Sequence, residues 1–439
     1  MTGYSGWSYQ PFRPFDHDRT RPMVVRLAPA RDSAELEWRG SGPATIFWAR
    51  RGSGNWEKKS VQPGTVSITG LQNEIDYEIY LRGAGGRQSE TRLLRTGEPL
   101  GPIVNYLHPE DEAYAFSGQY LGSPSLLRLP DGALLASMDY FSKPGGQNYT
   151  QIFRSEDDGT TWRWLTDLYP CFWGKLFLHR GALHMLGITA EYGGIIIGKS
   201  EDGGRHWGTP TVIAQGGRVR KGLGFHRAPT HPIVYGRRLW FTAEFGSWHS
   251  GHHHSLLLSA GENADLLNAA VWELNPPVQI EGIKHTIEGN LVTAPDGGLV
   301  NVLRHARGKA VLLRADSENP AAPQRFERIL NFPPGDVKFE ILQKDGLYYA
   351  VGNAPPLPGQ ETLSSPRNVL ALYASTDLLH WEHRRDIINH ADMDELRVGF
   401  QYPSCLLEGD ELLVLSRTAW NGAHNRHDSN MMTFHRVKL

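Results

Sequence analysis

The chain has little cysteine, no long apolar run and almost no net charge. Its 439 residues include only two cysteines, Cys171 and Cys405, so we expect two reduced thiols and neither a disulfide framework nor a cysteine-based zinc site. No apolar run approaches the roughly 18 residues that a membrane-spanning helix needs. The formal net charge of −2 provides no field for nucleic acid or an anionic membrane, so neither is an expected partner.

Signals for targeting, helices and nucleotide binding are also missing. The first residues, MTGYSGWSYQ, have neither the basic start nor the apolar segment of a signal peptide. We therefore expect a cytoplasmic protein, or a secreted one if a leader has been removed. No glycine-rich phosphate loop follows a strand and opens a helix, so no nucleotide is expected. We predict no cofactor.

Glycine, proline and tryptophan are abundant instead, with 48, 28 and 13 residues. Short β-branched and aromatic runs alternate with clusters of Gly, Pro, Asp and Asn, and long stripes with a helical period are missing. This pattern predicts an all-β protein. A length of 439 residues predicts two domains or one very large one.

The first predicted domain covers residues 22–98 and follows an N-terminal extension, residues 1–21. It shows about seven short strands with a period of two, such as AELEWRG and YEIYLRG. The segment ITGLQNEIDYEIYLRGAGG resembles the E–F corner of fibronectin type III domains, with Leu71 six residues before Tyr77. The resemblance implies a β-sandwich in which the Tyr77 hydroxyl ties down the preceding loop. We leave the role of this domain open.

The second predicted domain, residues 99–439, repeats a unit of about fifty residues. Each unit reads as an apolar strand, a tight turn, a second strand, a polar loop, a third strand and a short outer strand. Four-stranded units repeated radially predict a β-propeller, here with six blades. The sixth unit lacks an outer strand, and we expect residues 102–107, PIVNYL, to supply it. The units start near Gly122, Phe172, His226, Glu288, Lys338 and Gln401.

Two turns in this repeat carry a family resemblance. SEDDGTTW at 155–162 and SEDGGRHW at 200–207 resemble the Asp-box hairpins of sialidase-like (BNR-repeat) β-propellers, and STDLLHW at 375–381 is a shortened version. In such a hairpin the Asp side chain caps the turn, the Gly adopts a left-handed conformation and the Trp packs between strands. The resemblance implies a sialidase-like propeller, whose Asp-box turns lie away from the functional face. In such propellers the first strands begin and the second strands end on the functional face, so Tyr120, Ser123, Glu191 and the tail GAHNRHDSN (422–430) are also candidate functional residues.

A glutamate and an arginine bracket IEGNLVTAPDGGLVNVLR, two strands joined by a Pro-Asp-Gly turn. The hairpin brings Glu288 and Arg304 side by side at one sheet edge. The resemblance to sialidases implies that Glu288 polarises a nucleophilic tyrosine, Tyr402, and that Arg304 and Arg367 hold a substrate carboxylate. A tyrosine hydroxyl has a pKa of about 10, so it needs a nearby base to act as a nucleophile.

The chain also departs from the sialidase pattern. Sialidases begin their first blade with Phe-Arg-Ile-Pro, whereas this chain has Gly122 where that arginine belongs. The expected acid/base aspartate is missing, so Asp139, the nearest carboxylate, and His226 are the candidate acids. We therefore expect a sialidase-like protein that is not a true sialidase.

Three functions remain open. The first is an exo-acting glycoside hydrolase on an anionic oligosaccharide, for example one that contains a uronate. Its predicted catalytic residues are Glu288, Tyr402, His226 and Asp139. Its predicted substrate-binding residues are Arg304, Arg367, Arg417, Arg227, Lys338, Gln401, Trp173, His427, Asp428 and Asn430.

The second function is a polysaccharide lyase that acts by β-elimination on a uronate-containing glycan. His226 or Tyr402 would remove the C5 proton and Arg304 would neutralise the carboxylate. The third is a non-catalytic glycan-binding propeller, with tryptophan stacking platforms at Trp173, Trp248 and Trp420. The oligomeric state stays open.

The segment WHSGHHH is rich in histidine and raises the question of a metal site at residues 249–254. Consecutive histidines point in different directions, and a loop of this kind is more often solvated. We predict no metal site.

Overall fold

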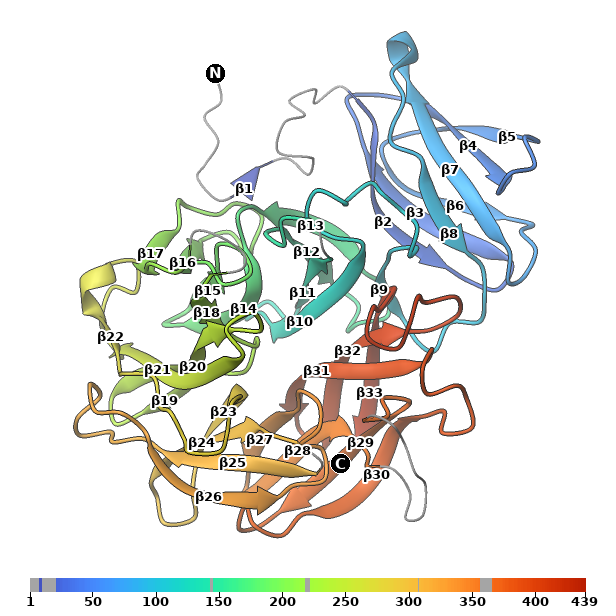
Figure 1. Ribbon diagram of the computed structural model, residues 1–439. Helices are drawn as coiled ribbons and strands as arrows, with labels where there is room; N and C mark the ends of the chain where they lie inside the picture. Colours follow the sequence, from blue (N-terminus) through green and yellow to red (C-terminus); the bar gives the residue numbers. More distant parts are fainter. Residues whose placement is uncertain (1–7, 10–20, 143–144, 218–221, 307, 356–364) are drawn as a thin grey trace.

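The computed structural model describes residues 8–9, 21–142, 145–217, 222–306, 308–355 and 365–439, and within these ranges the protein is all-β. Its helical segments are two short 3-10 turns, η1 (Ala84–Gly86) and η2 (Ala269–Val271). Most of the predicted extension, residues 1–21, lies outside the described residues; its strand β1 (Ser8–Tyr9) pairs with β13. Figure 1 shows a ring of sheets with a separate two-sheet module on one side.

The N-terminal module contains the seven strands expected from the alternating pattern. Every second residue of β3 is buried, and these side chains include Trp38, so the two sheets enclose one core. The Tyr77 hydroxyl accepts a hydrogen bond from the Gln72 N–H at 2.8 Å, as the tyrosine-corner pattern predicts. One sheet holds β2 (Met23–Pro29), β3 (Ser33–Arg39) and β6 (Gly64–Thr69); the other holds β5 (Glu57–Val61), β4 (Ala44–Arg50), β7 (Asp76–Gly83) and β8 (Arg92–Arg95).

Six antiparallel sheets, numbered I to VI, follow one another along the rest of the described chain. In Figure 1 they succeed one another around a common centre, which is consistent with a propeller. The first three are sheet I with β10 (Tyr120–Arg128), β11 (Leu134–Phe141), β12 (Thr150–Ser155) and β13 (Arg163–Leu168); sheet II with β14 (Phe172–His179), β15 (Ala182–Ile188), β16 (Ile195–Ser200) and β17 (Thr211–Ala214); and sheet III with β18 (Gly224–His226), β19 (Ile233–Tyr235), β20 (Arg238–Ser247), β21 (His252–Gly261) and β22 (Trp272–Leu274).

The last three sheets complete the ring. The predicted unit starts lie within two residues of the observed first strands, except that the first strand of sheet III is split into β18 and β19. Pro229 and Pro232 interrupt it, since proline has no N–H to donate to β20. The sheets are IV with β23 (Ile287–Thr293), β24 (Leu299–Arg304), β25 (Lys309–Arg314) and β26 (Arg325–Asn331); V with β27 (Glu340–Lys344), β28 (Leu347–Asn353), β29 (Val369–Ser375) and β30 (Glu382–Asn389); and VI with β31 (Gly399–Glu408), β32 (Glu411–Ala419), β33 (Met431–Lys438) and β9 (Ile103–Tyr106).

Strand β9 closes the ring from the other end of the sequence. It pairs with β33, with Tyr106 opposite Met431, so the predicted completion of the sixth sheet by residues 102–107 is confirmed. This pairing joins the first strand after the N-terminal module, β9, to the last strand of the chain, β33, in one sheet.

The two turns that resemble Asp-boxes have the predicted hydrogen bonds. In the first, the Asp157 carboxylate accepts from the Ser155 hydroxyl at 2.9 Å and from the Thr161 N–H at 2.8 Å. Gly159 has φ +89°, a left-handed conformation, and the buried Trp162 donates to its carbonyl at 3.1 Å. Asp202 and Trp207 repeat this arrangement in the second turn.

Polar side chains join neighbouring sheets near the ring centre. Ser404 of β31 accepts from the Leu126 N–H at 3.0 Å, and Ser125 of β10 accepts from the Leu176 N–H at 3.0 Å. Asn290 does the same for sheet V. These contacts satisfy buried main-chain donors and fix the inner strands relative to one another.

The N-terminal module shares its core with the ring. Ile103, Tyr106 and Met431 belong to the same apolar cluster as the module's Trp38. The buried Arg92 of β8 pairs with the buried Asp111 at 2.6 Å. The module is therefore packed onto sheet VI and the segment that follows β9.

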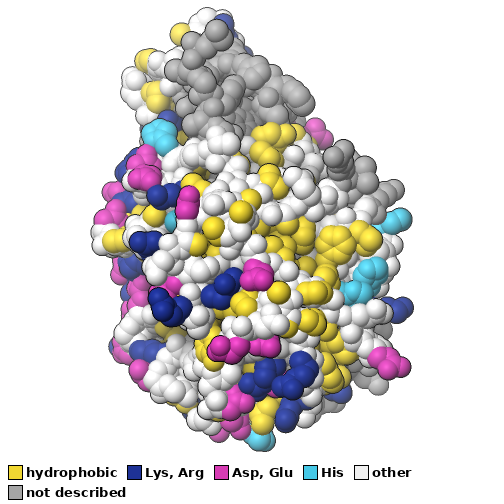
Figure 2. All heavy atoms as spheres, turned by 90° about the vertical axis from the view of Figure 1, so that its left-hand side faces the viewer, with side chains coloured by type: hydrophobic (Ala, Val, Ile, Leu, Met, Phe, Trp, Pro, Cys, Tyr) yellow, Lys and Arg dark blue, Asp and Glu magenta, His cyan; other side chains and the backbone are white. Residues whose placement is uncertain are grey.

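None of the helices that the structure describes is long and apolar enough to cross a membrane. On the side of the ring that includes sheets II and III, Figure 2 shows basic and acidic side chains interspersed.

Candidate active site

One cavity of about 620 Å³ opens at the ring centre, and every sheet contributes to its wall. Sheets I to III and their loops supply mainly aromatic and neutral polar groups, and sheets IV to VI supply arginines and a tyrosine. The residues at the predicted functional positions that line it are Tyr120, Ser123, Trp173, Glu191, His226, Arg227, Trp248, Glu288, Arg304, Arg367, Tyr402, Arg417, His424, His427, Asp428, Ser429 and Asn430.

A backbone irregularity recurs at the start of four inner strands. In sheets I, II, IV and VI the strand register shifts across one inserted residue, a β-bulge. In each case the inserted residue has a left-handed φ between 50° and 59° and lines the cavity. Bulges re-aim side chains, and left-handed non-glycine residues concentrate at functional sites. The four residues are Ser123, Trp173, Glu288 and Tyr402.

Glu288, Arg304 and Tyr402 form the centre of the cationic side. Arg304 Nη1 lies 3.0 Å from Glu288 Oε2 and 3.2 Å from the Tyr402 hydroxyl. Glu288 is 3% exposed, so this is not a solvated rim pair. The hairpin predicted from the sequence thus brings its two ends together, and sheet VI adds the tyrosine.

Opposed electrostatic effects act on these groups. Burial alone would raise the pKa of Glu288, but the Arg304 guanidinium, His226 and the Tyr402 hydroxyl together hold it below its ordinary value. Burial and the Glu288 carboxylate raise the pKa of Tyr402, although three guanidiniums oppose them. At neutral pH, therefore, Glu288 is ionised and Tyr402 keeps its proton.

Two more guanidiniums face Tyr402. Arg417 lies over the Tyr402 ring at 5.0 Å and donates to the His427 carbonyl, and Arg367 donates to the Gln401 side chain. Within the described ranges neither makes an ion pair with a carboxylate, and neither Nε has a hydrogen-bond partner. Burial lowers the pKa of Arg367 to about 10, and neighbouring arginines add to this effect. The described residues thus leave positive charge on the cationic side without a compensating carboxylate.

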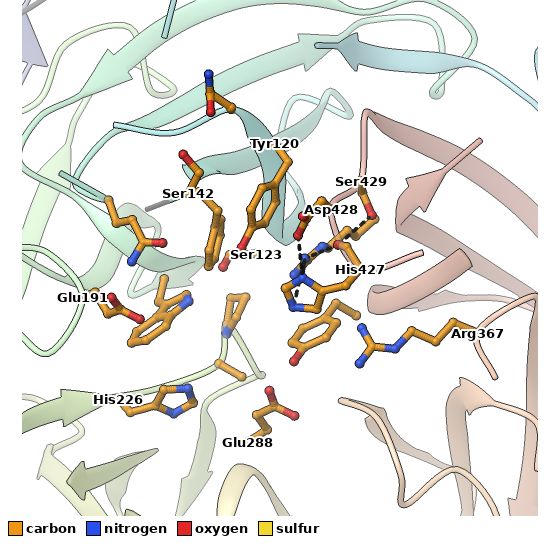
Figure 3. A pocket seen from close by; sticks show the side chains of 18 of the residues that line it. Tyr120, Ser123, Ser142, Glu191, His226, Glu288, Arg367, His427, Asp428 and Ser429 are labelled. Atoms are coloured by element: carbon orange, nitrogen blue, oxygen red, sulfur yellow. Dashed lines mark hydrogen bonds and ion pairs between the residues drawn. The ribbon is translucent and has the colours of Figure 1, made fainter. Parts of the chain in front are cut away.

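His226 is oriented by a buried carboxylate. Its Nδ1 lies 2.7 Å from Glu244 Oε2, and the other Glu244 oxygen accepts the Glu288 N–H at 2.9 Å. Glu244 therefore couples the position of His226 to that of Glu288. Figure 3 shows Glu191 and His226 approaching the cavity from the side opposite Arg367, with Glu288 between them.

Three predicted site residues lie behind the wall. Asp139 is buried and accepts hydrogen bonds from the Thr150 hydroxyl at 2.5 Å and from the Trp173 N–H at 2.7 Å. Lys338 is also buried and donates to the Pro403 carbonyl, and Gln401 binds Arg367 and the Arg426 carbonyl. None of the three lines the cavity.

Other predicted binding residues line the wall but are partly engaged. The Asn430 side chain bonds both main-chain groups of Trp420, at 2.7 and 3.1 Å, and Arg227 donates to the carbonyls of Trp173 and Leu186. His427 Nδ1 lies 2.8 Å from Asp428 Oδ1. These groups position the wall as well as forming it.

The tryptophans differ sharply in their exposure. Trp173 is only 8% exposed, whereas Trp248 at the cavity edge is 53% exposed. Trp420 does not line the cavity; it packs against His390 and donates to the Glu98 carbonyl near the N-terminal module. Only Trp248 of the three offers an open ring face.

The histidine-rich segment is only partly a loop, because β21 begins at His252 and includes His253 and His254. Alternation along the strand stacks His252 on His254 at 4.6 Å and turns His253 to the other face, beside Trp248. Among the described residues no group of three or more His, Cys, Asp or Glu side chains has the arrangement of a metal site.

The position predicted to lack the first sialidase-like arginine has no room for a side chain. A Cβ added at Gly122 would lie 2.3 Å from the Phe141 ring. Arg417, from sheet VI, lies over that same ring at 5.5 Å. The third guanidinium therefore comes from another sheet.

Sequence reasoning missed three polar lining residues: Gln119, Ser142 and Gln147. The first two lie beside a first-strand start and a second-strand end, so the repeat could have identified them. Gln147 lies in a connecting loop with φ +48°, and its sequence context carries no such signal.

Comparisons by sequence yield no match: no known family matches the chain and no curated protein is detectably similar to it. Solved structures do resemble it. A Hadza microbial sialidase has a TM-score of 0.54 and 13% identity, covering 96% of this chain and 99% of its own. An α-L-arabinanase of Penicillium chrysogenum in complex with arabinobiose has a TM-score of 0.51 and 16% identity, covering 77% and 96%.

An α-L-arabinofuranosidase of Fusarium graminearum in complex with an iminosugar inhibitor has a TM-score of 0.52 and 13% identity, covering 77% of this chain and 96% of its own. These neighbours are β-propeller glycosidases. At such identities the likeness concerns the fold alone, and it supports a β-propeller fold for this chain.

Proposed function

We propose that the protein is an exo-acting glycoside hydrolase that removes an anionic sugar, such as a uronate, from an oligosaccharide. The observation that carries this proposal is Tyr402 held beside both Glu288 and Arg304, with further guanidiniums around it. Structural neighbours that are glycosidases support the reaction class. The proposed architecture is a six-bladed propeller, residues 99–439, behind a fibronectin type III-like sandwich, residues 22–98.

The first step of the proposed reaction forms a glycosyl-tyrosine. The Tyr402 hydroxyl gives its proton to the Glu288 carboxylate as its oxygen bonds to the anomeric carbon. The bond from that carbon to the leaving oxygen breaks, and protonated His226 gives the leaving oxygen a proton. Arg304 donates to the developing phenolate oxygen and stabilises its charge.

The second step releases the sugar. A water molecule gives a proton to His226 while its oxygen replaces the tyrosine oxygen at the anomeric carbon. Tyr402 recovers its proton from Glu288, and the site returns to its starting state. Two successive displacements retain the anomeric configuration, and a tyrosine nucleophile is a known exception to the two-carboxylate scheme.

The arginines supply the preference for an anionic sugar. Arg367 and Arg417 have no carboxylate partner within the described residues, so a substrate carboxylate would compensate their charge. Guanidiniums bind carboxylates through paired hydrogen bonds, which makes them selective as well as strong. An arabinobiose-like neutral sugar offers no such group, which favours the anionic substrate.

A lyase remains the second candidate because Tyr402 and Glu288 could also catalyse a β-elimination. Tyr402, deprotonated with the help of Glu288, would remove the C5 proton of a uronate whose carboxylate is neutralised by Arg304. Elimination breaks the bond between C4 and the leaving oxygen without water: Tyr402 passes the proton taken from C5 to that oxygen, and a C4–C5 double bond remains.

The test is incubation with two kinds of oligosaccharide, one with a uronate at its non-reducing end and one with an internal 4-O-glycosylated uronate, read by mass spectrometry and by absorbance near 235 nm. Hydrolysis gives products heavier by one water and no rise in absorbance; an unsaturated product supports the lyase instead. Tyr402→Phe and Glu288→Gln should each lower kcat by roughly 10⁴-fold or more, with melting temperatures near that of the wild type. Tyr235→Phe, outside the cavity, is the control. Saturable binding without any product would leave only a glycan-binding propeller.

A further inference from the structure

The cavity has two chemically distinct halves. The cationic half contains Arg304, Arg367 and Arg417 from sheets IV to VI, and the aromatic half contains Tyr120, Phe141, Trp173 and Trp248 from sheets I to III. In the proposed reaction the cationic half holds the anionic sugar. The rest of the oligosaccharide must then leave the cavity past other groups.

Trp248 has the features of a preformed platform. Its ring is 53% exposed although it lines the cavity, so it presents aromatic surface to a ligand there. The turn that carries it is fixed: the Trp248 N–H donates to the Tyr192 hydroxyl at 3.1 Å, and Ser247 and Ser250 bond each other's main chain.

Two histidines support the Trp248 ring from the protein side. The ring centroids of His253 and His285 both lie 4.7 Å from the Trp248 ring centroid, and their Nδ1 atoms lie 3.0 Å apart. Burial and the neighbouring histidines lower the pKa of His253 to about 2, and burial also lowers that of His285. The platform and its support are therefore uncharged at neutral pH.

An uncharged aromatic face suits the C–H face of a neutral sugar and gives no advantage to a second anion. We propose that Trp248 forms a second sugar subsite, which binds a neutral sugar residue attached to the anionic sugar held by the arginines. This proposal rests on the proposed function for the anionic sugar. It implies that, in the natural substrate, the terminal anionic sugar is followed by a neutral one.

The test compares two probes that share the anionic sugar: methyl glucuronide and a glucuronyl-galactose disaccharide. Trp248→Ala should raise the KM for the disaccharide about tenfold while changing kcat/KM for methyl glucuronide by less than about twofold. Trp248→Phe should restore most of the loss, since it keeps a flat ring. Trp56→Ala, an exposed tryptophan of the N-terminal module, is the matched control.

Binding separates this proposal from the proposed reaction. Calorimetry with Tyr402→Phe protein should show weaker disaccharide binding when Trp248 is also replaced by Ala. Trp248-dependent binding without cleavage by the wild type would overturn the hydrolase and retain the subsite. The subsite would be overturned, and the hydrolase retained, by either of two results. One is an equal loss of activity with both probes in Trp248→Ala, and the other is cleavage and binding that do not change in Trp248→Ala. Binding of neither probe would overturn both.

Discussion

Both halves of the cavity contain bulge residues with a left-handed φ, but the side chains of these residues differ. In sheets I and II the left-handed bulge residues are Ser123 and Trp173, and in sheets IV and VI they are Glu288 and Tyr402. The inserted residue thus carries a neutral side chain in sheets I and II and an ionisable, reactive one in sheets IV and VI. The architecture aims a side chain at the centre, and the identity of that side chain determines the chemistry.

Apart from the reacting groups Tyr402 and Glu288, the largest expected effect comes from removing an arginine of the cationic half. Arg367→Gln should lower kcat/KM for an anionic substrate by roughly 30- to 10³-fold, because a desolvated charge pair with the substrate is lost. A neutral analogue should lose little. Steady-state kinetics with both substrates would measure the difference, with Arg314→Gln on the outer strands as the control.

The same variant should not lose stability. Burial lowers the pKa of Arg367 to about 10, so its charged form is disfavoured in the folded protein, and the described residues offer it no carboxylate. We expect the melting temperature of Arg367→Gln to equal or exceed that of the wild type. A large drop in melting temperature, or equal kinetic losses for anionic and neutral substrates, would contradict the idea that this charge serves the ligand.

A smaller effect is expected at Glu244, which contacts both His226 of sheet III and Glu288 of sheet IV and so links the two halves. Glu244→Gln can keep only one of its two acceptor contacts, to His226 or to the Glu288 N–H. Because a small misplacement of reacting groups is costly, kcat should fall by up to about 10²-fold while KM stays near the wild-type value. A rise in KM with unchanged kcat would show that Glu244 acts on the wall and not on the reacting groups.

Sequence predicted the fold well because its signals are local and repeated. The strand, turn and loop pattern located all six sheets, and PIVNYL was recognised as the missing outer strand. Paired hydrogen bonds in the turns around Asp157 and Asp202 follow from residue types at fixed spacing. The number of blades and the relationship of the N-terminal module to fibronectin type III domains remain predictions.

The site was predictable only as far as strand position determines it. Lys338 and Glu340 are two residues apart, so both side chains point the same way, yet they lie below the cavity as part of a buried ionic cluster. Asp139 ends the second strand as expected, but it faces the Trp173 N–H. The depth of a side chain along the ring axis and the conformation of a bulge both depend on packing between sheets. The sequence of a single strand does not determine that packing.

Asp139 should therefore affect stability more than activity. Burial raises its pKa to about 7, above the value of about 3.9 expected in the unfolded chain. The folded protein thus holds the proton more tightly, so its stability falls as the pH rises from about 4 to about 7. Asp139→Asn should remove up to about 4 kcal/mol of that fall, and kcat should change little.

Chemical denaturation at several pH values measures this slope. Asp167→Asn is the matched control, because burial also raises the pKa of Asp167 to about 7 in the same sheet. Both variants should flatten the profile. Loss of turnover in Asp139→Asn without a change in the stability profile would instead restore this residue as the acid.

The smallest effect tests whether the N-terminal module shapes the cavity. Asn421 precedes the segment that carries His427 and Asp428, and its side chain donates to the Thr96 carbonyl at 2.8 Å and accepts from Arg95 at 3.2 Å. Asn421→Gly removes these contacts without strain, since this residue has φ +43°.

We expect this variant to lose about 1 kcal/mol of stability and to raise KM less than fivefold with kcat unchanged. Asn421→Asp, which keeps the acceptor for Arg95, should recover part of the loss. An unchanged KM would mean that sheet VI alone holds the wall in place. A raised KM would mean that the cationic half extends, through one asparagine, into a domain that contributes no residue to the cavity itself.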